Sequence, residues 1–206
     1  MTDRAEPRLA ATNITKSYGR SQVLARVDLR VHAGEVLAIV GANGCGKSTL
    51  LRICAGLVSP DSGTVRVRGR LGYCPQEGGV AELLTPGEHF VLIGAGRGLS
   101  RTEARSSGST AAAALDWPGA ARTGVARELS GGTRQKLNLV LGELHAPDLL
   151  LLDEPYQGFD EGTYLDFWRQ VLDWRDAGRA VVVVTHLLHD LGHVDQVVDL
   201  GAGVPR

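Results

Sequence analysis

Lysine is scarce in this chain of 206 residues, and arginine carries almost all of the positive charge. Only Lys16, Lys47 and Lys136 are lysines. Lysines and arginines together number 22 against 23 acidic residues, which leaves a formal net charge of −1. A balance so close to zero argues against the strongly basic surface with which general nucleic-acid or membrane-surface binders hold anionic partners.

Cysteine is too rare to hold the fold together. The three cysteines, Cys45, Cys54 and Cys74, are odd in number and lack the paired spacing of a zinc site. Neither a disulfide framework nor a structural zinc site is therefore indicated. The expected environment is reducing and cytoplasmic.

Long apolar runs are missing as well. No stretch approaches the ~18 apolar residues that a membrane-spanning helix needs. Residues 1–7 are polar and acidic, and they lack the apolar segment of a secretory signal peptide. Any role at a membrane is therefore expected to come through a partner protein.

What the chain does contain is typical of a soluble globular protein, with 43% hydrophobic and 22% charged residues. A length of 206 residues suits one compact α/β domain with a small insertion. We therefore expect a single domain over residues 1–206. The insertion, which is predicted to be helical, is placed at residues 82–128.

The segment Gly41–Thr49 fits the phosphate-binding pattern G-x-x-x-x-G-K-[ST] and has the flanks that this pattern needs. Val36–Val40 before it is an unbroken apolar run of strand length, and a helix pattern follows from Ser48. Strand, glycine turn and helix together aim backbone N–H groups and the positive end of a helix dipole at one point. We interpret the segment as a nucleotide site rather than as a glycine turn that matches the pattern by chance.

The parts of this loop have separate expected tasks. Gly41, Gly44 and Gly46 let the backbone turn tightly and approach an anion closely. Lys47 can reach the β- and γ-phosphates of a nucleotide, and the Ser48 hydroxyl can ligate Mg²⁺. The other loop positions expected to contact the nucleotide are Asn43, Cys45 and Thr49.

Two more buried strands are predicted, and both end in polar residues. Leu149–Leu152 leads into Asp153 and Glu154, and Val181–Thr185 leads into His186. In an open parallel sheet, ligands bind outside the carboxyl ends of the strands. These side chains and the phosphate loop are therefore expected to meet in one crevice.

The residue types in this crevice suit nucleotide hydrolysis. Asp153 offers the oxygen ligand that Mg²⁺ prefers. Glu154 can accept or orient the proton of an attacking water, an effect worth ~10²–10⁴ in rate. His186 can contact the γ-phosphate and hold the water and Glu154 in place. Each acid alone is more often a cap or an ion-pair partner and a lone histidine more often structural, but beside a phosphate loop we interpret all three as catalytic or metal-binding.

A second anion-binding helix terminus is predicted at Ser130-Gly131-Gly132, because a helix pattern follows this segment directly. It lies far along the sequence from the phosphate loop. One ATP can use both termini only if two chains meet head to tail. The alternative for these three residues alone is a simple helix cap with a glycine turn.

Periodicity and turn residues predict the remaining elements. Lys16–Arg20 is expected to be a turn between two strands. Thr85 and Ser100 are expected to cap two helices, the second of which is interrupted at Ser106–Ser109. Residues 117–125 read as irregular. Further strands are expected at 9–15, 23–31, 64–68, 71–74 and 197–200, and a further helix at 159–177.

The order of these motifs resembles that of the ATP-binding subunit of ABC transporters over essentially the whole chain. Ser130 within Leu-Ser-Gly-Gly is the most specific feature, because other P-loop NTPases do not pair that sequence with this spacing. The resemblance implies an α/β fold, namely a P-loop NTPase with a mostly parallel core sheet, an N-terminal antiparallel β subdomain and a small helical subdomain. It also implies an ATPase that uses ATP and Mg²⁺.

The resemblance assigns roles to further residues. It implies that Tyr18 stacks on adenine and that Gln76 senses Mg²⁺ and the γ-phosphate. Ser130–Gly132 would bind the γ-phosphate of ATP held by the opposite subunit, and Asp160 would cross the dimer interface. The expected metal-site residues are then Ser48, Gln76 and Asp153.

The resemblance also implies partners. Residues 82–128 match the helical subdomain that docks onto coupling helices of an integral membrane permease. The implied function is an ATP-hydrolysing subunit that dimerises head to tail on ATP, as a homodimer or heterodimer, and drives that separate permease. It would lie in the cytoplasm, on the inner face of the cell membrane. Leu84-Thr85 ahead of Glu88 looks slightly more like export-type relatives.

Some residues depart from the family pattern. Thr133 stands where a glutamine usually follows Ser-Gly-Gly, which affects side-chain contacts to the opposite nucleotide but spares the backbone donors. Tyr156-Gln157 replaces the commoner small residues after the acidic pair, and Phe159 replaces a leucine.

Two other classes of function compete with the transport subunit. A non-transport ABC ATPase acting on ribosomes or nucleic acid is disfavoured by the single nucleotide unit and by the lack of a coiled-coil arm and a basic tail. A regulatory binding module that has lost hydrolysis is disfavoured by the intact Lys47, Asp153, Glu154 and His186.

Cys45 carries an expectation of its own. It lies two residues before Lys47 and near a helix N-terminus, and both a positive helix end and an ammonium favour a thiolate. A maleimide is therefore expected to modify Cys45 first and to block the phosphate site, while Cys54 and Cys74 stay buried and inert. The alternative is a Cys45 side chain that is turned away from the nucleotide.

Overall fold

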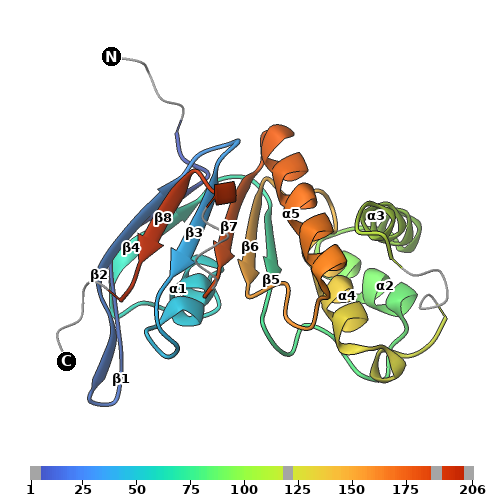
Figure 1. The fold of residues 1–206 in the computed structure, drawn as a ribbon, viewed down its shortest axis with the longest axis horizontal. Helices are drawn as coiled ribbons and strands as arrows, with labels where there is room; N and C mark the ends of the chain where they lie inside the picture. Colours follow the sequence, from blue (N-terminus) through green and yellow to red (C-terminus); the bar gives the residue numbers. More distant parts are fainter. Residues whose placement is uncertain (1–5, 118–122, 187–191, 202–206) are drawn as a thin grey trace.

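Five short strands form a parallel sheet at the centre of the computed structural model, which describes residues 6–117, 123–186 and 192–201. Their order across the sheet is β5-β6-β7-β3-β8 (Figure 1). The three central strands are buried at every position, as expected for unbroken apolar runs that are covered on both faces. The strands are β3 (Val36–Val40), β5 (Leu71–Cys74), β6 (Leu149–Asp153), β7 (Ala180–Val184) and β8 (Gln196–Asp199).

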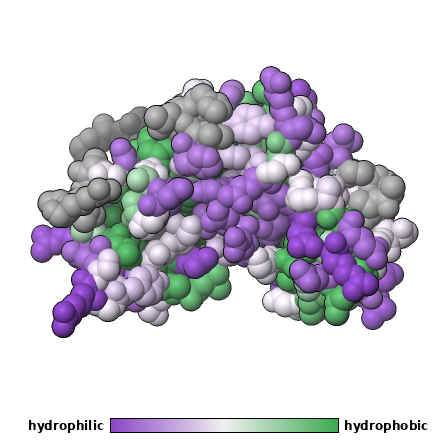
Figure 2. Space-filling model, turned by 60° about the horizontal axis from the view of Figure 1, so that its bottom comes forward, coloured by the Kyte–Doolittle hydropathy of each residue, from purple (hydrophilic) through white to green (hydrophobic). Residues whose placement is uncertain are grey.

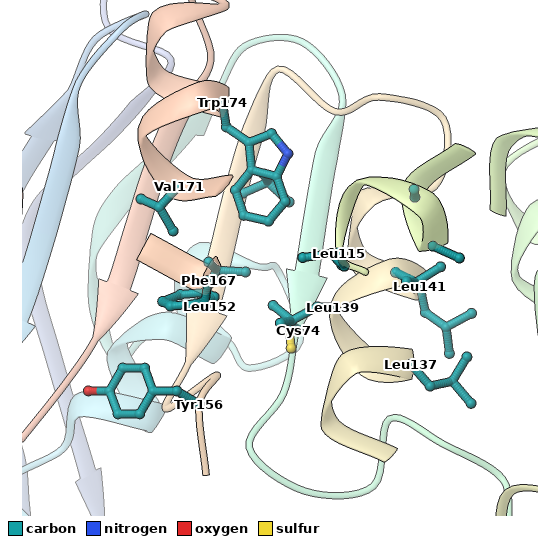
Figure 3. Close-up of a cluster of buried hydrophobic side chains, with 14 of the residues drawn as sticks. Cys74, Leu115, Leu137, Leu139, Leu141, Leu152, Tyr156, Phe167, Val171 and Trp174 are labelled. Atoms are coloured by element: carbon teal, nitrogen blue, oxygen red, sulfur yellow. The ribbon is translucent and has the colours of Figure 1, made fainter. Parts of the chain in front are cut away.

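One face of this sheet packs against two helices. Because side chains alternate along a strand, Leu150 and Leu152 of β6 face these helices, while Leu149 and Leu151 face the other way. Figure 3 shows Leu152 in one cluster with Phe167, Val171 and Trp174 from one helix and Leu137 and Leu139 from the other. The helices are α4 (Gly131–Glu143) and α5 (Glu161–Asp176).

The opposite face packs against one helix and a second sheet. This second sheet has three antiparallel strands in the order β2-β1-β4, and its apolar residues share a core with the helix and with the central strands. It is the antiparallel subdomain that the family resemblance predicted. The elements are β1 (Leu9–Tyr18), β2 (Ser21–Val31), β4 (Ser62–Val67) and α1 (Lys47–Cys54).

The hairpin between β1 and β2 is tighter than predicted. The turn was expected over Lys16–Arg20, but β1 continues through Tyr18, and only Gly19 and Arg20 form the turn. Gly19 adopts a φ of 59°, which suits a two-residue hairpin loop. The prediction was wrong because residues 16–18 still pair with β2.

Two further helices form a group at one end of the molecule, beyond α4 (Figure 1). Both begin with the predicted caps: Thr85 and Glu88 form one capping box, and Ser100 and Glu103 form the other. The bounds 82–128 of the inserted subdomain stay a prediction. The helices are α2 (Pro86–Gly96) and α3 (Arg101–Ala114), and a short 3₁₀ turn, η2, follows at Ala126–Glu128.

α3 is continuous across Ser106–Ser109, where an interruption was predicted. Gly108 faces the ring of Phe90 in α2, and a Cβ at this position would lie 2.3 Å from the ring Cγ. The Ser107 hydroxyl accepts a hydrogen bond of 3.0 Å from the His145 N–H. The prediction was wrong because contacts that only small residues allow outweigh their low helix propensity.

The other predicted strands and helices are present, with small shifts of their ends. The segment read as irregular, residues 117–125, lies partly outside the described residues. In the part of the chain that the structure describes, no helix is both long enough and apolar enough to cross a bilayer.

Candidate active site

All five strands of the parallel sheet end at one edge, and the predicted site residues lie there. Gly41 follows β3, Gln76 comes shortly after β5, Asp153 ends β6 and is followed by Glu154, and His186 comes shortly after β7. Figure 2 shows this edge turned forward, with hydrophilic residues across its centre. A pocket of about 480 Å³ is lined by Tyr18, Val23, Asn43, Gly44, Gly46, Lys47, Ser48, Thr49, Gln76, Glu154, Gln157 and His186.

The loop between β3 and α1 needs its glycines. Gly41, Gly44 and Gly46 have φ values of 142°, 80° and 104°, which residues with a side chain rarely adopt. A Cβ at Gly46 would also lie 2.7 Å from the Val23 carbonyl oxygen. The loop therefore turns tightly enough to bring the N-terminus of α1, with its unpaired N–H groups, to the pocket.

Lys47 is the first residue of α1, and its ammonium is held against the loop. Its Nζ donates to the carbonyl oxygens of Gly41 at 2.8 Å and Ala42 at 3.2 Å. The residue is only 5% exposed. A positive charge in this position, beside backbone N–H groups, is suited to bind an anion.

Ser48 and Asp153 form an oxygen-rich pair between α1 and β6. The Ser48 hydroxyl donates to Oδ1 of Asp153 at 3.1 Å. The other oxygen, Oδ2, is buried and has no hydrogen-bond partner in the described structure. Burial raises the pKa of Asp153, and the hydrogen bond from Ser48 opposes this effect. A hard cation satisfies such an oxygen and favours its ionised form, so this pair fits a Mg²⁺ ion.

Glu154 is held in a conformation that is rare for a residue with a side chain. Its φ is 44°, in the left-handed region, and such strain is often found at functional sites. Oε2 of Glu154 accepts hydrogen bonds from Nε2 of Gln76 at 3.1 Å and Nε2 of Gln157 at 2.7 Å, and it lies 3.7 Å from Nδ1 of His186. A carboxylate fixed at the pocket in this way can accept a proton from water.

Tyr18 lies at the rim of the pocket, at the end of β1. The residue is 52% exposed, and Nζ of Lys16 lies 5.6 Å from its ring centroid. An exposed aromatic ring at the rim of a pocket can stack on a planar base. The stacking role predicted for Tyr18 stays a prediction.

Ser130, Gly131 and Gly132 lie outside this pocket. Ser130 caps α4, because its hydroxyl accepts a hydrogen bond from the Thr133 N–H at 3.3 Å. Ser130 and Gly131 are exposed, whereas a Cβ at Gly132 would lie 2.8 Å from the Gly158 carbonyl oxygen. This second helix N-terminus therefore faces the surface and not the pocket of its own chain.

The sequence matches the protein family described as ABC transporter over residues 24–157, more than half of the chain. The chain belongs to this family. The predicted resemblance and the predicted P-loop NTPase fold are thus confirmed. As an ABC ATPase, the chain binds and hydrolyses ATP, which was also predicted.

Individual relatives of this ABC ATPase agree with the family match. An uncharacterized ABC transporter ATP-binding protein of Methanocaldococcus jannaschii is 29% identical, and the match covers 96% of this chain and 76% of that protein. The aliphatic sulfonates import ATP-binding protein SsuB of Burkholderia pseudomallei is 35% identical, with 98% and 64% covered. The chain thus spans slightly less than two thirds of the length of SsuB.

Solved structures show the same fold. One is the dimeric structure of a post-hydrolysis state of an ATP-binding cassette bound to ADP and Pi. It is similar to this chain with a TM-score of 0.86 and 26% identity, and the match covers 96% of this chain and 97% of that one.

Gln157 and Asn138 were not predicted as site residues of this ABC ATPase. Gln157 contacts Glu154 because the two residues close a turn, in which the Gln157 N–H donates to the Glu154 carbonyl at 3.4 Å. Pro155 in the second position is a typical turn signal that points to this closure. Asn138 has no comparable signal. It lies buried in α4, and its Nδ2 donates to the Pro75 carbonyl at 2.5 Å, next to Gln76.

Asp160 also lies outside the pocket. It caps α5, because its Oδ1 accepts a hydrogen bond of 2.8 Å from the Thr163 N–H. That bond lowers the pKa of the exposed Asp160 carboxyl. Within one chain Asp160 therefore stabilises a helix terminus, and its predicted place at a dimer interface stays a prediction.

Cys45 requires a correction. Its Sγ packs beside Gly41, and the residue lines a second cavity of about 230 Å³ with residues 198–200. The side chain therefore lies outside the lining of the nucleotide pocket, which agrees with the alternative orientation, and the predicted contact of Cys45 with the nucleotide stays a prediction. Cys54 and Cys74 are buried as predicted. Burial raises the pKa of Cys54 to about 12 and also raises that of Cys74.

Proposed function

We propose that this ABC ATPase is the subunit of a transporter that dimerises head to tail on ATP and drives a separate membrane permease. One observation carries the proposal. The phosphate loop and the acidic pair at the end of β6 meet at one pocket, while the second anion-binding terminus, at Ser130, is exposed outside it. These observations support both the hydrolysis of ATP and the pairing with a second copy.

ATP would bind with its phosphates on the loop between β3 and α1. The Lys47 ammonium now satisfies the carbonyl oxygens of Gly41 and Ala42, and phosphate oxygens would take over this charge. The N–H groups at the start of α1 would donate to the same phosphates. Tyr18, at the rim of the pocket, would stack on the adenine ring.

Ser48 and Asp153 would hold Mg²⁺, and Gln76 would face it from the end of β5. The unpartnered Oδ2 of Asp153 and the Ser48 hydroxyl beside its Oδ1 support this assignment. When bound, the ion would supply positive charge that offsets the negative charge developing on the phosphates. The carboxylate of Asp153 keeps its place because β6 is buried on both sides of the sheet.

Glu154 would orient the attacking water and accept its proton. The carboxylate lies at the pocket, held by neighbouring amides, and His186 approaches the same oxygen. His186 would contact the γ-phosphate and keep the water in line. General-base catalysis of this kind contributes ~10²–10⁴ in rate.

A second copy of the chain would complete each site. The N-terminus of α4 is a helix end with exposed Ser130 and Gly131, and these residues do not line the pocket of their own chain. In a head-to-tail pair it would face the γ-phosphate held by the partner. The similar cassette bound to ADP and Pi is named as dimeric, which supports the pairing of two copies.

The permease would dock on the group formed by α2 and α3, within residues 82–128, and would hold the chain at the cytoplasmic face of the membrane. Leu83 and Leu92 are 69% and 57% exposed there, and they offer apolar contacts. The pattern Leu84-Thr85 ahead of Glu88 predicted export. The named relatives do not support this direction of transport. SsuB is named an import protein, and import is the direction that we propose.

Replacing Glu154 tests the proposal. Glu154→Gln should retain ATP binding but lower steady-state turnover at least ~10²-fold, because the amide cannot take the proton. It should also accumulate as an ATP-bound dimer in size-exclusion chromatography, since closed sites no longer reopen by hydrolysis. Glu6→Gln, which removes an exposed carboxylate outside the pocket, is the matched control and should behave as wild type. Near-normal turnover of Glu154→Gln contradicts the role of this residue.

A further inference from the structure

We propose that Gln157 is a positioning residue for hydrolysis, which holds the Glu154 carboxylate in the orientation that receives a proton from water. The inference rests on the proposed function of Glu154 and deepens it. It concerns a residue at which this chain departs from the small residues that are commoner in its family.

Gln157 makes a short hydrogen bond to Glu154, and Gln76 donates to the same carboxylate oxygen. Nε2 of Gln157 donates to Oε2 of Glu154 at 2.7 Å, and Nε2 of Gln76 donates to the same oxygen at 3.1 Å. Among the described residues, both side-chain amides bind Oε2 and none binds Oε1. Two donors on one oxygen restrict rotation of the carboxylate, so Oε1 keeps a fixed direction in which to meet a water.

The backbone delivers the Gln157 amide to this place. Its N–H closes a turn onto the Glu154 carbonyl at 3.4 Å, and Glu154 itself adopts the left-handed φ of 44°. Between them, Tyr156 is buried, its hydroxyl bonds with that of Thr185, and its ring packs edge-on against Phe167 at 5.8 Å. The turn is therefore anchored in the core by Tyr156, and its conformation places the Gln157 side chain next to Glu154.

The chemistry of an amide suits this task. Gln157 carries no charge, so it orients the carboxylate without neutralising it as a lysine or arginine would. Its side chain is exposed and lines the nucleotide pocket, so it contributes little buried surface to the fold. Removal of its amide should therefore change the catalytic step more than the stability of the chain.

Two isosteric variants test the proposal. Gln157→Met keeps the length of the side chain but has no donor, and Gln157→Glu places a second carboxylate against the first. Gln157→Met should lower kcat for ATP about threefold to tenfold, which is the effect expected from the loss of one hydrogen bond. It should leave KM and Tm unchanged. Gln157→Glu should lower kcat at least as much. The control is Gln196→Met, which removes a 2.8 Å bond from an amide to the Glu35 carboxylate outside the pocket and should leave kcat unchanged.

A double variant separates positioning from other effects. In the Glu154→Gln background, Gln157→Met should change the residual single-turnover rate by less than about twofold, because no carboxylate is left to position. A kcat of Gln157→Met within twofold of wild type overturns the inference, and so does an equal loss in both backgrounds or a loss that follows a lowered Tm. If Glu154→Gln itself turns over normally, the proposed function of Glu154 fails instead, so the two failures are distinguishable.

Discussion

Gly108→Ala should destabilise the chain, although alanine is the better helix former. A Cβ at Gly108 would lie 2.3–2.7 Å from three atoms of the Phe90 ring, about 1 Å short of ordinary contact. Phe90 is only 7% exposed, so its ring cannot move aside without leaving the core. Overpacking costs ~1–3 kcal/mol and the helix gains ~1 kcal/mol, so we expect the free energy of unfolding to fall by about 1 kcal/mol.

Urea unfolding measures this change, and two further variants isolate its cause. At Gly162 in α5, an added Cβ would meet only Oδ1 of Asp160, at an ordinary 3.6 Å. Gly162→Ala should therefore leave stability unchanged or raise it by up to ~1 kcal/mol. Phe90→Leu should make room for the alanine, so the effects of Gly108→Ala and Phe90→Leu should be non-additive by at least ~0.5 kcal/mol.

The same substitution should thus lower the free energy of unfolding at Gly108 but not at Gly162. A Gly108→Ala protein that is as stable as wild type, or more stable, would refute the packing explanation for the continuity of α3. The ATPase rate of folded Gly108→Ala should equal that of wild type, because the residue lies outside the nucleotide pocket.

Two other predictions concern the pocket and its surroundings. Tyr18→Ala should weaken ATP binding by ~1–3 kcal/mol in calorimetry, whereas Tyr18→Phe and Tyr18→Trp retain it; unchanged binding by the alanine variant would mean that the ring only packs. A maleimide should label Cys45 first, because the thiols of Cys54 and Cys74 are buried and have raised pKa values. MgATP should not slow this labelling, since Cys45 faces the second cavity; protection by MgATP in peptide mapping would contradict the observed orientation.

Much of the site follows from the sequence because parallel strands share an edge. Once Leu149–Leu152 and Val181–Thr185 are read as buried strands, the residues after them must lie beside the phosphate loop. The structure places Glu154 and His186 there. The first residues of two helices were also predictable from the sequence, because a cap at Thr85 or Ser100 depends on a residue only three positions away.

The features that the sequence did not predict depend on contacts between distant segments. The helical conformation of Ser106–Ser109 depends on Phe90 in another helix. The direction of the Cys45 side chain depends on residues 198–200, which are more than a hundred positions away. Gln157 is close to Glu154 in sequence, but their contact needs a left-handed backbone at Glu154, which composition and periodicity do not reveal.

The hydrogen bond from Asn138 to the Pro75 carbonyl connects α4 to the segment that follows β5. Asn138 lies eight residues after Ser130, about 12 Å along the helix. A Cβ at Gly79 would come within 2.0 Å of Oδ1 of Asn138, so the segment after β5 is pressed closely against this side chain. Through these contacts α4, which begins at the exposed Ser130, is connected to the backbone beside Gln76, and Gln76 in turn binds Glu154.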